Sequence, residues 1–408
     1  MLLKLAWRNI WRNKGRTVIT MMAVMIAVVL SILMMSAKEG VYAKMIESMI
    51  LNMTGHAQIH QVDYVDEQML DNSLSLSEDL VNDLNESGLI KGWAPRIQTG
   101  ALVFKDSTSN TISKNAIVMG IDPDKEAEFI SLKEHVTVGE FITNEDNQVM
   151  LGEGLAERLK VKVGDSIILV SGGYHGSQAY GLYNVKGLVK YGSPELSNGV
   201  VFMPIKEAQW MYSLDSMCTN INIILKDESV LEESVSELNN ILSGKILVRD
   251  WKELNPELIN MIETDRVEGY IFMFILYMVI TFGLFGTMLM MLSERTREFG
   301  VLISIGMKRF KLASVVWMEM IIISILGVLV GIAVAFPICY YFHSNPIQFG
   351  DEQAEMMADY GMEAVLQFSI DPSIFLTQAM IIFSISSVLA LFPFRKLLKL
   401  NPQEAMRV

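Results

Sequence analysis

Four stretches of this chain are apolar over about 20 residues, the length that a helix needs to cross the hydrocarbon core of a membrane. They lie at roughly 18–37, 269–292, 312–336 and 372–394, and the third contains one acidic residue, Glu319. The composition agrees with this pattern, since 51% of the residues are hydrophobic and the mean hydropathy is +0.33. The pattern predicts an α-helical membrane protein with four transmembrane helices.

The first apolar stretch follows five basic residues, as the core of a secretory signal peptide does. Its apolar run is longer than the about 7–15 residues of such a core, and no small-x-small cleavage site follows it. We therefore expect this stretch to be retained as a membrane helix.

A short strip of mixed charge, residues 293–311, joins the second and third apolar stretches. Its apolar positions Phe299, Leu302, Ile303, Gly306 and Phe310 recur at the spacing of one helical face. The spacing predicts a short amphipathic helix at a membrane surface, with its contact surface between Glu298 and Phe310. We call residues 293–311 the connecting strip.

Charge is divided unevenly along the chain, whose formal net charge is −13. Residues 1–16, the connecting strip and residues 395–408 together hold 14 of the 33 Lys and Arg but only 3 of the 46 acidic residues. Positive loops mark the cytoplasmic side. Both termini and the strip are therefore expected in the cytoplasm, with 38–268 and 337–371 on the other side. The net negative charge is explained by this topology. We expect no nucleic-acid partner.

The first residues, 1–16, predict an amphipathic helix that lies on the inner membrane surface. Leu3, Ala6, Trp7 and Ile10 share one face, and tryptophan is favoured in the headgroup layer. A plain positively charged anchor is the alternative, but it does not require the aromatic stripe.

Between the first two apolar stretches lies a folded domain of about 200 residues. Helical spacing continues past the first stretch and precedes the second, which predicts two stalk helices. The domain itself alternates helices and strands at both ends and is mostly β in its centre. It is expected to be an α+β lobe with a β-rich lobe inserted in its middle. The expected strands are 55–62, 101–104, 115–119, 162–170, 183–190, 199–203 and 221–225, and the expected helices are 77–87, 152–159, 206–212 and 229–242.

The resulting division of the chain has nine segments. They are an interfacial helix (1–16), the first transmembrane helix with its stalk (17–54), an α+β domain on the side away from the cytoplasm (55–252), a stalk with the second transmembrane helix (253–292), the connecting strip (293–311), the third transmembrane helix (312–340), a loop on the side away from the cytoplasm (341–371), the fourth transmembrane helix (372–394) and a cytoplasmic tail (395–408).

No motif for catalysis or metal binding emerges. The run 172–176 is glycine-rich but lacks the Lys and Ser/Thr of a phosphate-binding loop, so a hairpin turn is expected there. His56 and His60, four strand positions apart, are about 13 Å from each other and do not fit one metal ion. Cys218 and Cys339 indicate neither a disulfide framework nor a metal site. We expect a non-catalytic chain without a metal or a cofactor of its own.

Glu319 inside the third apolar stretch has two interpretations. A proton or ion relay would use an ionisable group in the membrane. A packing role is favoured, because no partner acid or base is found deep in another stretch. Gly327 and Gly331 form a GxxxG pair that permits close helix packing, and Gly283 and Gly286 would permit it too. Packing within the chain is the ordinary interpretation, and contact between the subunits of an oligomer is the alternative.

Several segments together resemble the FtsX-like permease domain of the MacB/LolC/LolE class of ABC transporters. The basic start at 5–17, the strip at 294–302 with 306–309 and Glu319, and the tail at 401–407 are similar to this class. Segments 55–60, 152–165, 192–196 and 201–209 look closest to the lipoprotein-releasing LolC/LolE permeases. The hairpin 172–181 is the candidate for the carrier-docking hook of that group.

The resemblance implies a bacterial inner-membrane subunit that works with a cytoplasmic ABC ATPase dimer, which binds the ATP and Mg. It also implies a second permease copy, in a homodimer or a heterodimer, and a possible periplasmic carrier or adaptor, besides membrane lipids. The residues expected to couple to the ATPase are Glu294, Arg295, Arg297, Glu298, Phe299, Gly300, Leu302, Ile303, Gly306 and Phe310.

The expected activity is ATP-driven extraction of lipoprotein or other lipid-anchored cargo, by motion passed along the stalks. Met25, Val28, Met278 and Phe282 are the expected cargo path between the first two spans. One alternative is a MacB-type export permease for peptides or small molecules. Another is an FtsX-like regulator of cell-wall hydrolases.

Overall fold

The computed structural model describes residues 2–12, 14–65, 67–105, 112–129, 131–190, 194–242, 244, 246–348, 350 and 365–401. The chain forms two compact units. The helical unit comprises Met1–Ala43, Met261–Gln348 and Val365–Val408, and the inserted unit comprises Lys44–Asn260 and Phe349–Ala364.

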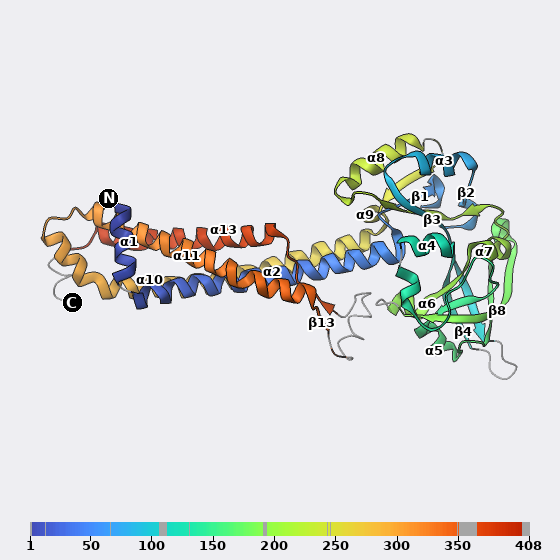
Figure 1. Ribbon diagram of the computed structural model, residues 1–408, viewed down its shortest axis with the longest axis horizontal. Helices are drawn as coiled ribbons and strands as arrows, with labels where there is room; N and C mark the ends of the chain where they lie inside the picture. The colour runs from blue at the N-terminus through green and yellow to red at the C-terminus, as the bar shows by residue number, and fades with distance from the viewer. Residues whose placement is uncertain are drawn as a thin grey trace. The chain divides into compact units, whose positions relative to one another are not determined.

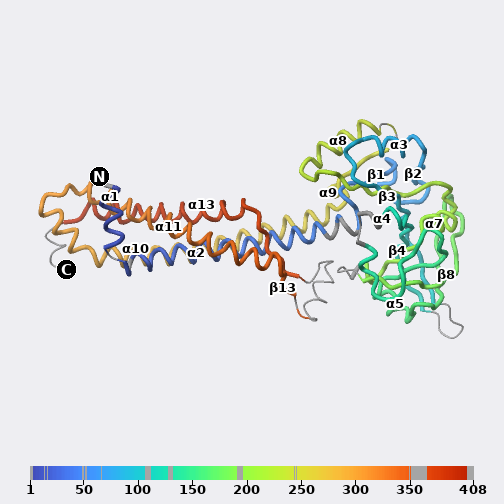
Figure 2. Tube along the Cα trace, in the orientation of Figure 1, coloured from blue at the N-terminus to red at the C-terminus, as the bar shows by residue number. Residues whose placement is uncertain are grey.

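The helical unit is built from long helices (Figures 1 and 2). Four segments are long and apolar enough to cross a membrane, namely Thr17–Glu47, Pro256–Ser304, Arg309–Ser344 and Pro372–Leu398. The four-helix prediction is thus confirmed by length and composition. The helices that contribute to the unit are α1 (Leu2–Arg12), α2 (Lys14–Met49), α10 (Pro256–Ser304), α11 (Arg309–Ser344), α13 (Pro372–Leu389) and α14 (Leu391–Leu398).

Close packing in the helical unit depends on the glycine pair of α11. A Cβ added at Gly327 would lie 2.8 Å from the Cβ of Val24, and one at Gly331 would lie 2.7 Å from the Cβ of Val28. Only glycine therefore lets α11 approach α2 this closely. The packing interpretation of the GxxxG pair is confirmed.

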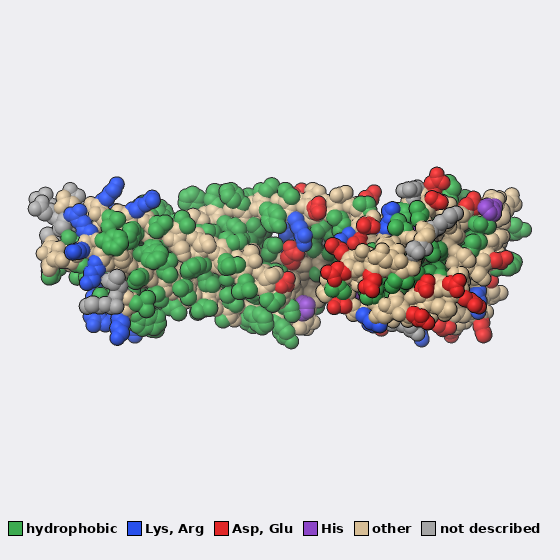
Figure 3. Space-filling model, turned by 90° about the horizontal axis from the view of Figure 1, so that it is seen from above, with side chains coloured by type: hydrophobic (Ala, Val, Ile, Leu, Met, Phe, Trp, Pro, Cys, Tyr) green, Lys and Arg blue, Asp and Glu red, His purple; other side chains and the backbone are tan. Residues whose placement is uncertain are grey.

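Helix α1 is amphipathic, as predicted, but its apolar face is divided. Ala6 and Ile10 are buried where α1 packs on α11, whereas Leu3, Trp7 and Trp11 are exposed. Figure 3 shows Lys and Arg side chains gathered at the end of the helical unit where α1 lies, and apolar side chains along the helices. Exposed tryptophans next to basic residues suit a headgroup layer.

The segment between α11 and α13 was expected to be a loop. In the structure, β13 (Ile347–Gln348) pairs antiparallel with β14 (Val365–Leu366). The acidic residues between these strands lie outside the described residues. Helix α13 begins at Pro372, and Asp371 caps it by accepting a hydrogen bond from the backbone N–H of Ser373.

The inserted unit contains one branched sheet of ten strands among the described residues. Its strands are β1 (Ala57–Gln61), β3 (Ile90–Lys105), β4 (Ser113–Ile121), β5 (Val136–Gly139), β6 (Val149–Gly152), β7 (Ser166–Gly172), β8 (Gln178–Val189), β9 (Val200–Pro204), β11 (Asn220–Leu225) and β12 (Ile246–Asp250). A separate pair joins β2 (Leu74–Ser75) and β10 (Met217–Cys218). The helices are α3 (Glu78–Glu86), α4 (Pro123–Phe129), α5 (Glu153–Leu159), α6 (Pro194–Gly199), α7 (Ile205–Tyr212), α8 (Leu231–Ile241) and α9 (Trp251–Leu254).

Strand β3 belongs to two lobes at once. Strands β12, β1, β11 and β3 form an open sheet, while β3, β4, β9, β6, β8 and β7 pair in a closed ring. The first group comes from both ends of the insertion and the ring comes from its middle. The two-lobe prediction is therefore confirmed, and β3 is the continuous strand that connects the lobes.

Parts of the strand prediction were wrong. Strand β3 begins at Ile90 rather than near residue 101, because Pro95 and Gly92 obscured its first half. The short strands β5, β6 and β12 were not anticipated. His56 lies just before β1, and not in the strand with His60.

Candidate functional site

The connecting strip is a helix end, a turn and a helix start. Helix α10 continues through Ser304, and α11 begins at Arg309. Gly306 has φ +102°, and the N–H groups of Gly306 and Met307 donate to the carbonyls of Ile303 and Leu302. This is a Schellman motif, which needs a left-handed residue. The prediction of one separate amphipathic helix is wrong, because Gly306 ends the helix.

One side of the strip is buried within the helical unit. Phe299 is only 1% exposed, and it packs in an apolar cluster with Leu312, Val316 and Leu397. Arg295 and Gly300 are also buried, and the Arg295 guanidinium lies 5.0 Å from the centre of the Phe299 ring. These three predicted coupling residues are therefore packed inside, so direct contact with a partner through them is ruled out in this conformation.

Arg295 forms an ion pair with Glu319 of α11. Its Nη1 lies 2.8 Å from Oε1 and 2.9 Å from Oε2, and both side chains are almost fully buried. The packing role of Glu319 is supported. The partner was missed because Arg295 was assigned to a surface helix, whereas it lies on a helix that runs on from the second apolar stretch.

Glu298 extends this pair to a third helix. Its Oε2 accepts a hydrogen bond from Nη2 of Arg12 at 3.0 Å and lies 3.6 Å from Nε of Arg295. The Arg12–Glu298 pair is exposed, so its own contribution to stability is about 0–1 kcal/mol. The charges nevertheless connect α1, α10 and α11 at one end of the helical unit.

The exposed side of the strip presents apolar side chains at a tip. Leu302, Ile305 and Phe310 are exposed, and Ile305 is 80% exposed. Of the other predicted coupling residues, Ile303 is half-buried, and Glu294, Arg297, Glu298 and Gly306 are exposed. Val301 and Ile305 were missed, although their place next to the glycine turn could have indicated them. An exposed apolar cluster with a charged rim is typical of a protein contact surface.

Helices α2 and α10 are tied together by a second set of charges in the helical unit. Nζ of Lys38 lies 2.5 Å from the backbone oxygen of Asp265 and 3.3 Å from its Oδ2, and the hydroxyl of Tyr42 also donates to that carboxylate. Arg266 pairs with Glu39 at 3.1 Å. We call these five residues the helix clamp. They connect α2 to α10 within the helical unit.

In the inserted unit, the π-helical turn η1 (Ile50–Thr54) ends the first long helical segment against the sheet. The carbonyl of Met53 accepts hydrogen bonds from Nη1 of Arg96 at 2.7 Å and from Nδ2 of Asn222 at 2.8 Å. Arg96 also binds the carboxylate of Glu126 at 2.5 and 2.9 Å, and both residues are buried. Carbonyls at helix ends lack helical partners, and here β3 and β11 provide them. We call this the Met53 joint.

The two histidines near this joint have different neighbours. Nδ1 of His56 accepts from the backbone N–H of Leu225, and its Nε2 lies 2.7 Å from Glu228. His60 stacks on the ring of Tyr64. Burial, reinforced by the positive charge of Arg249, lowers the pKa of His60 to about 4. No group of three or more potential metal-binding side chains occurs in the described part of the chain.

Family profiles match almost the whole chain. The profile described as MacB-like periplasmic core domain matches residues 17–241, and the one described as FtsX-like permease C-terminal matches residues 270–402. The chain belongs to the MacB/FtsX-like family of ABC transporter permeases. The connecting strip of this permease lies within the second match. With its four apolar helices, the permease is a multi-pass inner-membrane protein.

The permease is similar to two named groups within the family. It is 22% identical to the lipoprotein-releasing system transmembrane protein LolC of Neisseria meningitidis over 392 residues, which is 92% of this chain and 90% of LolC. It is 25% identical to the macrolide export ATP-binding/permease protein MacB of Escherichia coli over 141 residues, which is 33% of this chain and 22% of MacB. The full-length likeness is thus to LolC.

Among solved structures, the periplasmic region of MacB from Actinobacillus actinomycetemcomitans aligns with a TM-score of 0.35 and 11% identity, covering 52% of this chain and 96% of that one. The extracellular domain of the transporter YknZ from Gram-positive bacteria aligns with a TM-score of 0.34 and 13% identity, covering 47% and 98%. Both TM-scores are low, so the assignment to the family rests on the family profiles.

The four residues of the predicted cargo path of the permease differ in their exposure. Val28 is fully buried against Gly331, because the glycine pair of α11 draws α2 toward it. Met25 is half-buried on α2, whereas Met278 and Phe282 are exposed on α10. Val28 is therefore not exposed in the single chain, and the cargo path stays a prediction.

The hairpin between β7 and β8 was the candidate hook. Its turn closes through a hydrogen bond from the N–H of Gly173 to the carbonyl of Ser177 at 2.7 Å, and the N–H of His175 donates to Asp71 at 2.6 Å. The tip is thus held against its own domain, and the structure gives it no projecting arm.

Proposed function

We propose that this permease releases lipoprotein or other lipid-anchored cargo from the inner membrane, driven by a separate ATPase. The observation that carries this proposal is the likeness to LolC, which extends over 92% of the chain. In this proposal the termini and the connecting strip lie in the cytoplasm, in accordance with the basic residues gathered there. The inserted unit then lies in the periplasm.

The proposed mechanism is mechanical. A cytoplasmic ATPase dimer, which binds ATP and Mg, contacts the exposed apolar tip of the connecting strip. Its movement passes into α10, and the helix clamp makes α2 follow. Helix α2 is unbroken from Lys14 to Met49, so it is stiff enough to carry the displacement along its length. Two permease copies, alike or different, would move against each other, and a periplasmic carrier would receive the cargo.

Reconstitution tests the proposal directly. Liposomes containing the permease, its co-purified ATPase and a second permease if one is present are loaded with a lipidated protein and given ATP and a carrier. The expected result is ATP-dependent release of the lipidated protein. ATP hydrolysis without release would contradict the proposed cargo.

The strip is tested by Glu298→Arg and Ile305→Asp, which change exposed positions. Both should uncouple ATP hydrolysis from release while the permease stays folded. Arg12→Gln is the matched control, because it breaks the exposed ion pair of Glu298 without changing the strip. Gly300→Trp is less informative, since Gly300 is buried and a tryptophan there would disturb packing. Full coupling in both strip variants would contradict the role of the strip.

A second candidate function is export of peptides or small molecules. The MacB-like core domain and the partial likeness to MacB favour it. Co-purification of an adaptor protein, together with ATP-dependent export and no release of lipidated protein, would decide for this alternative.

A further inference from the structure

The closed ring of the inserted unit has an exposed apolar outer face. In the pairing register, Leu102 of β3 lies opposite Val170 of β7, which lies opposite Tyr180 of β8. The next row joins Ile168 to Leu182 across the same strands. Leu102, Val170, Tyr180 and Leu182 are all exposed. A contiguous apolar face of this kind on a domain surface usually marks a binding site.

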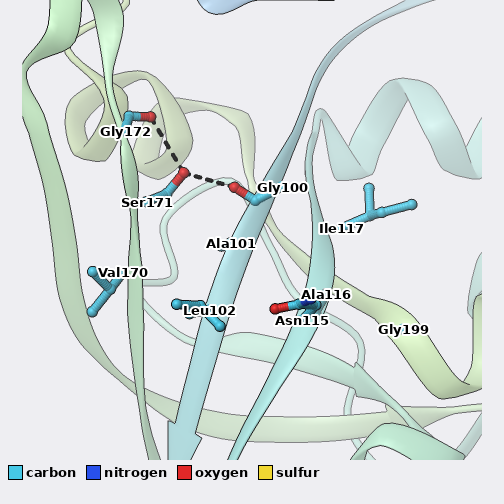
Figure 4. Close-up of a pocket in the computed structure, with 10 residues that line it drawn as sticks. All are labelled: Gly100, Ala101, Leu102, Asn115, Ala116, Ile117, Val170, Ser171, Gly172 and Gly199. Carbon is cyan, nitrogen blue, oxygen red and sulfur yellow. Dashed lines mark hydrogen bonds between the residues drawn. The ribbon is translucent and has the colours of Figure 1, made fainter.

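This face is hollowed where β3, β4 and β7 meet. Figure 4 shows a cavity lined by Leu102, Ile117 and Val170, and its volume is about 590 Å³. Gly100, Gly172 and Gly199 also line the cavity, and no atom of the described residues lies within 4 Å of a Cβ built at any of them. The hollow therefore exists because three positions lack side chains.

The lining offers little to a polar ligand. None of the ten lining residues is charged. The hydroxyl of Ser171 is already engaged, since it lies 2.7 Å from the carbonyl oxygen of Gly100 and 3.3 Å from that of Gly172 (Figure 4). Asn115 is the other polar side chain of the lining. Pockets of about 300–1,000 Å³ with mostly apolar walls and few polar groups are typical small-molecule sites.

We propose that this cavity binds a fatty acyl chain of the lipid-anchored cargo while the cargo leaves the membrane. The proposal rests on the proposed function for the nature of the cargo. A methylene group fills about as much space as a water molecule, about 30 Å³, so a chain of about 16 carbons needs roughly 480 Å³. The volume of about 590 Å³ is large enough for such a chain. An alkyl chain also matches a lining that has no charged residue and whose only hydroxyl, that of Ser171, is already hydrogen-bonded.

Charge argues for an esterified or amidated chain rather than a free fatty acid. None of the ten lining residues offers a positive charge to pair with a free carboxylate, whereas an acyl chain attached to a protein carries no charge of its own. A second copy of the chain or a protein partner on this face is the competing explanation that the test must separate.

The test uses the full chain in nanodiscs and a soluble lipopeptide with one palmitoyl chain that carries a diazirine. After irradiation, mass spectrometry should find adducts on β3, β4 and β7 near the cavity. A Cβ at Gly100 or Gly199 meets no described atom within 4 Å, so we expect Gly100→Leu and Gly199→Leu to fold normally with the leucine occupying part of the cavity. A leucine that displaces two methylene groups should lower the labelling there by about tenfold. Val138→Leu, at an exposed apolar position of β5, is the matched control and should label like the wild type.

Four results would overturn the proposal. Adducts confined to the membrane helices would do so, as would equal labelling in Gly100→Leu and Val138→Leu. Cross-links from this face to a second copy or to a co-purified protein, in place of lipopeptide adducts, would assign the face to a protein partner. The release assay separates the two proposals. Release that persists with a filled cavity overturns only the acyl site, whereas cavity labelling without any ATP-dependent release overturns only the proposed function.

Discussion

Arg295 and Glu319 face each other across α10 and α11 in a buried pair, with one guanidinium nitrogen 2.8 and 2.9 Å from the two carboxylate oxygens. The residues lie 24 positions apart, on either side of the Gly306 turn. The pair therefore connects the two helices between the membrane-spanning part and the exposed tip of the strip.

Removing one member of this pair should destabilise the permease strongly. Glu319→Ala leaves the buried guanidinium of Arg295 with only the exposed Glu298 carboxylate, 3.6 Å from its Nε, which costs about 3–5 kcal/mol. The double variant Arg295→Met with Glu319→Leu removes both charges and should be close to the wild type in stability. Thermal unfolding of the purified variants in one detergent measures this. Equal stability of Glu319→Ala and the wild type would show that Glu319 is not paired as described.

The sequence was a good guide to features that depend on local pattern. Apolar runs located the four spanning helices, and the GxxxG spacing located the contact at Gly331. It was a poor guide to features that depend on distant partners. Nothing in the spacing brings Arg295 to Glu319, or Arg96 to Met53, because these contacts arise only when separate elements pack.

The connecting strip illustrates the limit of periodicity. Its apolar residues keep helical spacing through Phe310, so the pattern predicts one helix. Gly306 interrupts this helix, and a single glycine within a periodic run gives only a weak signal. The sequence therefore predicted the candidate coupling residues only as a segment, while the division into buried Phe299 and exposed Ile305 needed the fold. The role of the segment in coupling stays a prediction.

The Met53 joint should matter more for coupling than for ATP hydrolysis. Arg96→Lys keeps a positive charge beside Glu126 but loses the fork that binds the carboxylate and the Met53 carbonyl together. We expect ATP hydrolysis near the wild-type rate and release lowered by about tenfold, the effect of losing about 1.4 kcal/mol from the joint. Release per ATP in liposomes measures this split.

Two controls make the Arg96 experiment specific. Arg96→Ala leaves the buried Glu126 unpaired and should unfold the inserted unit more readily, by about 3–5 kcal/mol. Lys91→Ala, on an exposed position of the same strand, should change neither stability nor release. If Arg96→Lys releases cargo as efficiently per ATP as Lys91→Ala does, the joint has no part in transmission.

The glycines of the membrane helices should differ sharply in their tolerance of a methyl group. Gly331→Ala places a Cβ 2.7 Å from that of Val28, and the resulting overpacking costs about 1–3 kcal/mol. Gly283→Ala meets no described atom within 4 Å and should be neutral or stabilising by up to about 1 kcal/mol. Thermal unfolding in the same detergent compares the two. A tolerated Gly331→Ala would contradict the close contact of α11 with α2.

His60 should make the inserted unit sensitive to acid. Its pKa is about 4 in the folded protein, below the ordinary value of 6.5, because burial and Arg249 disfavour the charged ring. The unfolded chain therefore binds more protons between these values, and stability falls as the pH drops through about 6.5 toward 4. From pH 7.5 to pH 5 the loss of stability attributable to His60 is about 2 kcal/mol.

His60→Gln cannot be protonated and should lose less stability over the same interval, whereas His175→Gln, at an exposed histidine, should behave like the wild type. Thermal unfolding of the full chain in nanodiscs at the two pH values, followed by tryptophan fluorescence, measures the difference. An unchanged acid sensitivity in His60→Gln would show that the ring is protonated as easily in the fold as in the unfolded chain.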